Sequence, residues 1–199
     1  MEKDLNSDDI DVGGSDDCFV NIPASKNHEF YLNGEIGDPT KYSKWFNVIR
    51  NASPNDRIII HINSFGGSLY TAIQFIRVMA ESRANVTASV EGACMSAATM
   101  IFLASDIQQI SEHSVFMFHN YSSFSFGKGG ELYDNIVFDR KWSKNLLSKL
   151  YHNFLSKQEV KDILNNRDIW LDCDQVIKRL KKREKKNEIE AKKHQEIKE

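Results

Sequence analysis

The stretch Val90-Glu91-Gly92-Ala93-Cys94-Met95-Ser96-Ala97-Ala98-Thr99-Met100 places one serine among small residues, between a β-branched run and an apolar pattern with helical spacing. In a strand-to-helix turn of this kind the backbone can approach closely and the Ser96 hydroxyl stays reachable. Amides of the following helix can point at an oxyanion from its positive end. Taken alone, small residues at a helix start more often serve packing, so the neighbouring segments decide between the two interpretations.

Those neighbouring segments repeat the order strand, small-residue turn, helix. Residues 57–63 contain four isoleucines, which is typical of a short strand buried on both faces of a parallel sheet. A Ser-Phe-Gly-Gly-Ser turn follows at 64–68, and then an apolar helical pattern at 69–79. This order predicts an α/β fold of stacked β-turn-α repeats with right-handed crossovers. We expect further strands at 28–33, 84–90, 106–110 and 114–119, and a turn at 33–39. Two helices are expected over 97–104 and 131–154, and two more are expected to begin at the caps Thr40 and Ser156.

Three chemically informative groups fall at the carboxyl ends of these predicted strands. They are the Gly66-Gly67 pair, Ser96 and His119. Sites form at that edge of a parallel sheet, so we expect the three groups to lie together. This convergence favours a nucleophile with a neighbouring base over the packing interpretation of the Ser96 turn.

Composition limits the classes of protein that fit. With 199 residues, 41% hydrophobic and 27% charged, the chain fits one compact soluble domain. A net charge of −2 does not favour nucleic acid, and no apolar run reaches transmembrane length. Cys18, Cys94 and Cys173 have no metal-ligand spacing. Their small, odd number predicts reduced thiols and a cytoplasmic location.

The chain divides by charge into three predicted parts. Residues 1–17 form an acidic head that we expect to be disordered, 18–180 form the domain, and 181–199 form a charged tail. The tail is typical of a helix, which either contacts a partner or nucleic acid electrostatically or is merely solvated. The helix predicted over 131–154 is longer than a core of this size needs, which favours packing on another subunit. The Ser- and Gly-rich segment 122–130 before it predicts a mobile loop.

Together these motifs resemble the Clp protease proteolytic subunit family, the serine peptidases of the crotonase-like superfamily. Residues 62–68 are similar to its Ile-Asn-Ser-Pro-Gly-Gly loop, 92–98 to its nucleophile turn, and 116–119 to its strand ending in the catalytic histidine. A looser match at 167–171 is similar to its Arg-Asp-x-[Phe/Trp]-Leu segment near the third triad member. The resemblance spans roughly 29–176.

The resemblance implies a role for each matching residue. Ser96 is the nucleophile, His119 the general base and later the general acid, and Asp168 the carboxylate that orients the imidazole. The amides of Gly67 and Ala97 form the oxyanion hole. No metal or organic cofactor is implied. Asp162, Asp172 and Asp174 compete with Asp168 for its role, although Asp172 or Asp174 could instead cap the last helix.

The sequence also departs from the family pattern. Phe65 replaces the loop proline, and Asn120-Tyr121 stands where Gln-Pro usually follows the histidine. The Gly-Leu-Val-Asp strand expected after the last helix is missing, and the acidic head is unlike the family's axial segment. These differences predict a phage-encoded or accessory paralogue, such as a head-maturation-type protease that processes virion precursors.

The leading hypothesis is a serine endopeptidase that works inside a homo-oligomeric ring or double ring on peptide or unfolded protein. An unfoldase ATPase partner would deliver the substrate, because the chain has no phosphate-binding loop of its own. No nucleic acid or membrane is expected, and the location is the cytoplasm, or the host cytoplasm for a phage protein. A catalytically silent ring or scaffold protein of the same fold stays open. An acyl-CoA hydratase or isomerase fits less well, because the chain lacks the usual glycine-rich motif of those enzymes.

Overall fold

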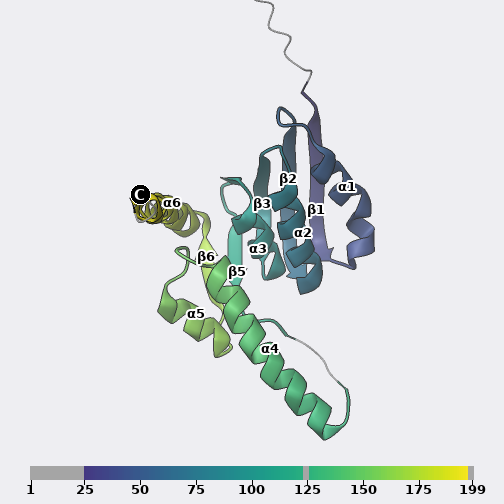
Figure 1. The fold of residues 1–199 in the computed structure, drawn as a ribbon, viewed down its shortest axis with the longest axis vertical. Helices are drawn as coiled ribbons and strands as arrows, with labels where there is room; N and C mark the ends of the chain where they lie inside the picture. Colours follow the sequence, from purple (N-terminus) through teal and green to yellow (C-terminus); the bar gives the residue numbers. More distant parts are fainter. Residues whose placement is uncertain (1–24, 123–125, 197–199) are drawn as a thin grey trace, which may run out of the picture.

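The computed structural model describes residues 25–122 and 126–196. The predicted acidic head lies outside the described residues, as does the centre of the loop predicted over 122–130. The remainder is a mixed α/β fold built on one sheet, with the helices arranged around it (Figure 1). The predicted fold class is therefore confirmed.

The sheet is parallel except at one edge. Its order is β1-β2-β3-β5-β6, and the short strand β4 pairs with the first part of β3 while β5 pairs with its last part. Only β6 runs antiparallel, against β5. The strands are β1 (Asn27–Ile36), β2 (Arg57–Gly67), β3 (Val86–Met95), β4 (Ile107–Ile110), β5 (Val115–Phe118) and β6 (Ile169–Asp172).

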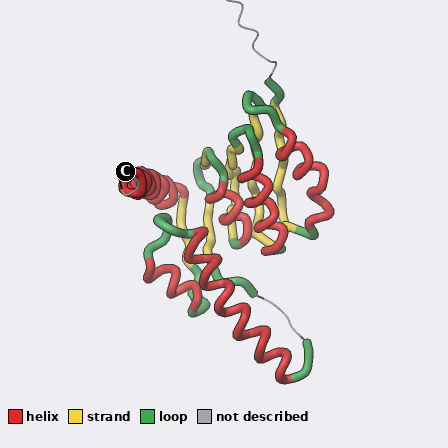
Figure 2. Tube along the Cα trace, in the orientation of Figure 1, coloured by secondary structure: helices red, strands yellow, loops and turns green. Residues whose placement is uncertain are grey.

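Three helices cover one face of the β1–β3 part of the sheet (Figures 1 and 2). They are α1 (Ser43–Asn51), α2 (Leu69–Glu81) and α3 (Ala97–Ala104). Between them and the sheet lies the hydrophobic core, in which the β2 isoleucines Ile58, Ile60 and Ile62 are fully buried. Removal of this apolar surface from water is the main free energy that holds the layers together.

The remaining helices extend the fold beyond the sheet. Helix α4 (Gly129–Leu150) projects away from the layered part, and α5 (Lys157–Leu164) packs against it (Figure 1). Helix α6 (Cys173–Glu196) is continuous through residue 180, where the sequence predicted the start of a charged tail. Arg179 of α6 donates to the Glu159 carboxylate of α5 at 2.7 and 3.0 Å, which ties these two helices together. Within the described ranges, no helix is both long enough and apolar enough to span a bilayer.

Several predicted element boundaries are wrong. Residues 33–39 were predicted as a turn, but β1 continues to Ile36, because a bulge near Gly34, at φ 72°, absorbs the irregularity. Residues 64–67 likewise belong to β2. The predicted Thr40 cap is replaced by Asp38, whose carboxylate accepts from the Thr40 amide at 2.9 Å and starts a 3₁₀ turn before α1.

The later caps follow the sequence more closely. Ser156 and Glu159 form the predicted capping box of α5. Asp172 accepts from the Gln175 amide at 2.8 Å and so caps α6, which was one of two predicted alternatives. The helix predicted over 131–154 ends at Leu150, because Asn153 adopts a left-handed conformation with φ 60° that a helix cannot continue through. Tyr151, directly after the helix, is fully buried.

Candidate active site

The Ser96 turn joins β3 to α3 in a conformation that is unusual for a residue with a side chain. Ser96 has φ 54° and ψ −126°, which costs roughly 1–3 kcal/mol in a non-glycine residue. Its amide donates to the Met117 carbonyl at 2.8 Å, and its carbonyl accepts from the Thr99 amide at 3.0 Å. These bonds to β5 and α3 hold the strained turn and present the Ser96 hydroxyl at the strand end.

The pairing of β3 with β5 brings His119 to that hydroxyl. Met95 is in register with Met117, so the residues just beyond these two positions lie side by side at the carboxyl edge. The His119 Nε2 atom lies 2.6 Å from Ser96 Oγ. In the tautomer protonated on Nδ1, the serine hydroxyl donates to Nε2, which is the arrangement that general-base activation requires.

The two loop glycines permit a close backbone approach to the same turn. A Cβ atom on Gly66, at φ 97°, would lie 2.6 Å from the Ser96 Cβ and 3.1 Å from the Ala97 nitrogen. A Cβ on Gly67, at φ 143°, would lie 2.3 Å from the Ile36 carbonyl oxygen. Both positions therefore require glycine. Gly67 and Ala97, the predicted oxyanion residues, line the same cleft as Ser96 and His119.

Asp168 lies beside the pair without contacting it. The antiparallel register matches Phe118 with Ile169, so one further step sets Asp168 opposite His119. Its side chain is exposed, and in the described part of the chain no hydrogen bond or ion pair joins it to His119. The structure thus brings together two members of the predicted triad and places the third on the adjacent backbone.

The competing aspartates are engaged elsewhere. Asp162 accepts from the Gln158 side chain at 2.9 Å and lies 3.9 Å from the Arg167 guanidinium. Asp172 is the cap of α6, and Asp174 belongs to the first turn of that helix. Their positions leave Asp168 as the carboxylate whose backbone is in register with His119.

A buried hydroxyl pair supports the Ser96 turn from below. Thr99 Oγ1 donates to the Ser96 carbonyl at 2.6 Å and lies 3.0 Å from the Tyr151 hydroxyl. Burial raises the pKa of Tyr151, and its ring packs edge-on against Phe118 at a centroid distance of 5.4 Å. No local sequence pattern predicts this pair, because 52 positions separate its members.

The neighbouring thiol is not an alternative nucleophile. Cys94 is fully buried, and this burial raises its pKa well above the ordinary range. A thiol that stays protonated is a poor nucleophile. Cys94 and Cys173 are both free. Ser96 is therefore the group at this turn that can attack a substrate.

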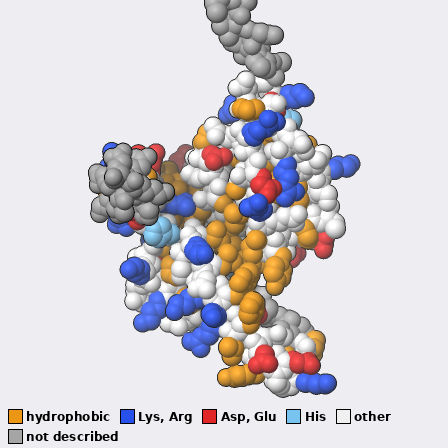
Figure 3. Space-filling model, viewed as in Figure 1, with side chains coloured by type: hydrophobic (Ala, Val, Ile, Leu, Met, Phe, Trp, Pro, Cys, Tyr) orange, Lys and Arg blue, Asp and Glu red, His pale blue; other side chains and the backbone are white. Residues whose placement is uncertain are grey.

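A cleft of about 700 Å³ opens at the serine and histidine. Its floor is apolar and includes the buried residues Met100 and Leu147. Its rim is aromatic, with Phe65 69% and Tyr70 73% exposed. In Figure 3, hydrophobic side chains gather where the lower end of α2 faces α4. Such a cleft suits an extended chain with apolar side chains.

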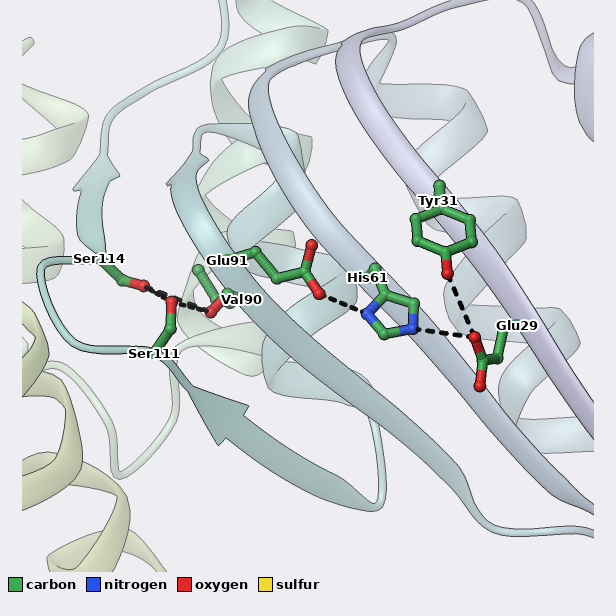
Figure 4. Close-up of polar contacts among 7 residues, drawn as sticks. All are labelled: Glu29, Tyr31, His61, Val90, Glu91, Ser111 and Ser114. Atoms are coloured by element: carbon green, nitrogen blue, oxygen red, sulfur yellow. Dashed lines mark hydrogen bonds and ion pairs between the residues drawn. The ribbon is translucent and has the colours of Figure 1, made fainter.

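A second histidine, which is not among the residues that line this cleft, lies between two carboxylates on the sheet (Figure 4). His61 of β2 lies 2.6 Å from a Glu91 oxygen through Nδ1 and 3.8 Å from a Glu29 oxygen through Nε2. The Tyr31 ring stacks on it at 4.6 Å, and the Tyr31 hydroxyl donates to Glu29. Over the residues described, no group of three or more His, Cys, Asp or Glu side chains is placed to hold a metal ion.

Comparison with known proteins identifies the family that has this α/β fold and this serine–histidine pair at the strand ends. The Clp protease family model matches residues 25–179, so the chain belongs to that family, as its motifs predicted. No curated protein matches the sequence. Among solved structures, a mutant of ClpP1 from Listeria monocytogenes matches with a TM-score of 0.62 and 22% identity, over 76% of this chain and 86% of that one. At this identity the likeness shows the fold.

Proposed function

We propose that this protein is a serine endopeptidase that uses Ser96 as nucleophile and His119 as base. The observation that carries the proposal is the 2.6 Å contact between His119 Nε2 and Ser96 Oγ, made at a strained turn in a member of the Clp protease family. A hydrogen bond between a histidine and a serine can also be purely structural. This one lies at the mouth of a cleft that Gly67 and Ala97 also line.

The proposed reaction proceeds through an acyl-enzyme. His119 takes the Ser96 proton as the oxygen attacks the peptide carbonyl, and the Gly67 and Ala97 amides donate to the resulting oxyanion. His119 then protonates the leaving amine. Water, deprotonated by the same imidazole, cleaves the ester and restores the serine. In this scheme Asp168 accepts from His119 Nδ1 and stabilises the imidazolium.

Assembly of several subunits is part of the proposal. Helix α4 carries four large hydrophobic side chains that are more than half exposed, which costs free energy unless another surface covers them. Family membership and this exposure support a homo-oligomeric ring or double ring. Contacts between subunits would then move Asp168 onto His119, and a separate unfoldase ATPase would deliver unfolded protein in the cytoplasm. The exposed residues are Tyr133, Ile136, Val137 and Phe138.

Hydrolysis of a fluorogenic peptide with an apolar residue on the acyl side of the scissile bond tests this function. The assembled wild-type protein should release the fluorophore, and the Ser96→Ala variant should not. Ser43→Ala, an exposed serine at the start of α1, is the matched control and should retain full activity. Equal rates for wild type and Ser96→Ala would contradict the proposal. An inactive wild-type ring would favour the silent-scaffold alternative, and turnover of an acyl-CoA by Ser96→Ala would favour the hydratase alternative.

A further inference from the structure

The cleft is chemically divided along helix α4. Residues 139, 142, 143, 146 and 147 all line it, and their spacing places them on a single face of the helix. Leu147, at one end of this row, is buried and forms part of the apolar floor. Asp139, at the other end, is half-buried and contributes a carboxylate. Eight residues of helix separate the two ends by about 12 Å.

The outer end near Asp139 is both acidic and aromatic. Trp142, one turn along α4, packs against the Tyr70 ring at a centroid distance of 6.1 Å. Tyr121 lies close to Asp139. Burial is the largest cause of the raised pKa of Tyr121, and the negative charge of the Asp139 carboxylate is the next. Aromatic faces and a carboxylate are together the surroundings that a Lys or Arg side chain prefers.

The charge of the cleft has one sign. Glu35 is its second acidic residue, and the Glu35 Cγ lies 3.0 Å from a Cβ built on Gly67, beside the proposed oxyanion hole. Among the described residues that line the cleft, none is Lys or Arg. The nearby α4 cations Arg140 and Lys144 line an adjoining cavity, which shares Tyr121 and Ser143 with the cleft. Neither carboxylate therefore has a cationic partner within the cleft.

We propose that the outer end of the cleft, formed by Asp139 with Tyr70, Tyr121 and Trp142, selects substrates that carry Lys or Arg. An extended chain advances about 3.3–3.6 Å per residue, so 12 Å corresponds to three or four residues. The preferred substrate then has an apolar residue on the floor near Ser96 and a basic residue three or four positions away. This inference rests on the proposed peptidase function and names its substrate class.

Binding to the Ser96→Ala protein tests this preference without requiring catalysis. Fluorescein-labelled peptides share one apolar anchor and carry Lys, Gln or Glu at each position three or four residues to either side. By fluorescence anisotropy the Lys peptide should bind about fivefold more tightly than the Gln peptide at one of these positions, and the Glu peptide more weakly than both. Added salt should shrink these differences, because the rim is partly exposed.

Introducing Asp139→Asn into the same protein should reduce the ratio of Lys to Gln affinities to near one. Asp134→Asn changes an exposed acid of α4 that does not line the cleft, so that ratio should stay as it was. Equal binding of the three peptides, or an equal effect of Asp134→Asn, would overturn the inference. If the wild-type protein cleaves peptides without a preference for Lys, the proposed subsite is contradicted and the proposed peptidase function is retained. If the protein prefers Lys peptides in binding but the wild type cleaves none of them, the proposed peptidase function is contradicted and the proposed subsite is retained.

Discussion

The two parts of this molecule hold their functional residues by different means. In the sheet layer, the parallel register of β3 with β5 brings the end of β5 next to the Ser96 turn, where His119 Nε2 lies 2.6 Å from Ser96 Oγ. In the part formed by α4, α5, β6 and α6, Asp168 precedes a four-residue antiparallel strand, and its side chain is exposed. Central strands that pack on a buried core fix a site within one chain, whereas a peripheral strand leaves its residue to be positioned by neighbouring surfaces.

Loss of the base should have the largest effect on the sheet side of this comparison. Replacing His119 by Ala leaves Ser96 without a proton acceptor, so we expect kcat for a peptide to fall about 10⁶-fold. The control is His113→Asn, which changes a histidine whose side chain is 89% exposed and whose φ of 67° asparagine tolerates. Retention of more than a tenth of the activity by His119→Ala would exclude the proposed base.

Asp168→Asn should have the next largest effect and tests the peripheral side. Asparagine keeps the shape but favours the wrong imidazole tautomer, so kcat of the assembled enzyme should fall about 10⁴-fold. Asp174→Asn, in the first turn of α6, should stay within a few-fold of wild type. If Asp168→Asn also stays within tenfold, Asp168 is not the third member, and the same measurement on Asp162→Asn and Asp172→Asn decides between its competitors.

Loss of the Tyr151 hydroxyl, which links the end of α4 to the Ser96 turn, should have a smaller effect. Tyr151→Phe removes the hydroxyl that lies 3.0 Å from Thr99 Oγ1, which itself bonds the Ser96 carbonyl. We expect a loss of about 1–2 kcal/mol in the free energy of unfolding, measured with urea, because Thr99 loses a buried partner. Tyr133→Phe, on the exposed face of α4, should change the free energy of unfolding by about 0.5 kcal/mol at most. Equal stabilities for the two variants would exclude a supporting role for the pair.

The smallest effect concerns the contact between α5 and α6. The Arg179 guanidinium lowers the pKa of Glu159 to about 2, below its ordinary 4.5. A lowered folded-state pKa means that the carboxylate stabilises the fold above pH 4.5, and that this stabilisation is lost as the pH falls towards 2. Because the pair is partly solvated, Glu159→Gln should cost about 1 kcal/mol at pH 7. Urea unfolding should show this difference vanishing at low pH, and a difference that is independent of pH would contradict the ion-pair origin.

The sequence predicted those parts of the site that depend on short, strongly patterned segments. The isoleucine run of β2 and the small residues around Ser96 are local signals, and convergence at strand ends follows from parallel topology. The expected convergence of Ser96, His119 and the Gly66-Gly67 loop at one cleft is therefore present in the structure, and their catalytic roles stay predictions. The exact contact of Gly66 with the Ser96 Cβ was not predicted, because it depends on the three-dimensional path of two loops.

What escaped the sequence depends on distant partners. Helix α4 ends at Leu150 although the helical pattern continues to residue 154, because the backbone of Asn153 is left-handed while Tyr151 packs in the core. The choice of Asp38 over Thr40 as a cap turns on which side chain reaches which amide. The acidic end of the cleft joins Asp139 of α4 to Tyr70 and Tyr121 from other parts of the chain, and no local pattern relates these residues.

Labelling with a fluorophosphonate tests the central claim most directly, because this probe reacts with a serine only where a base activates it. Intact mass and peptide mapping of the assembled protein should show one adduct per chain, on Ser96. The adduct should be absent from Ser96→Ala and strongly reduced in His119→Ala. The absence of any adduct on the assembled wild-type protein, or an adduct on a different serine, would contradict the assignment of Ser96 and His119 as nucleophile and base.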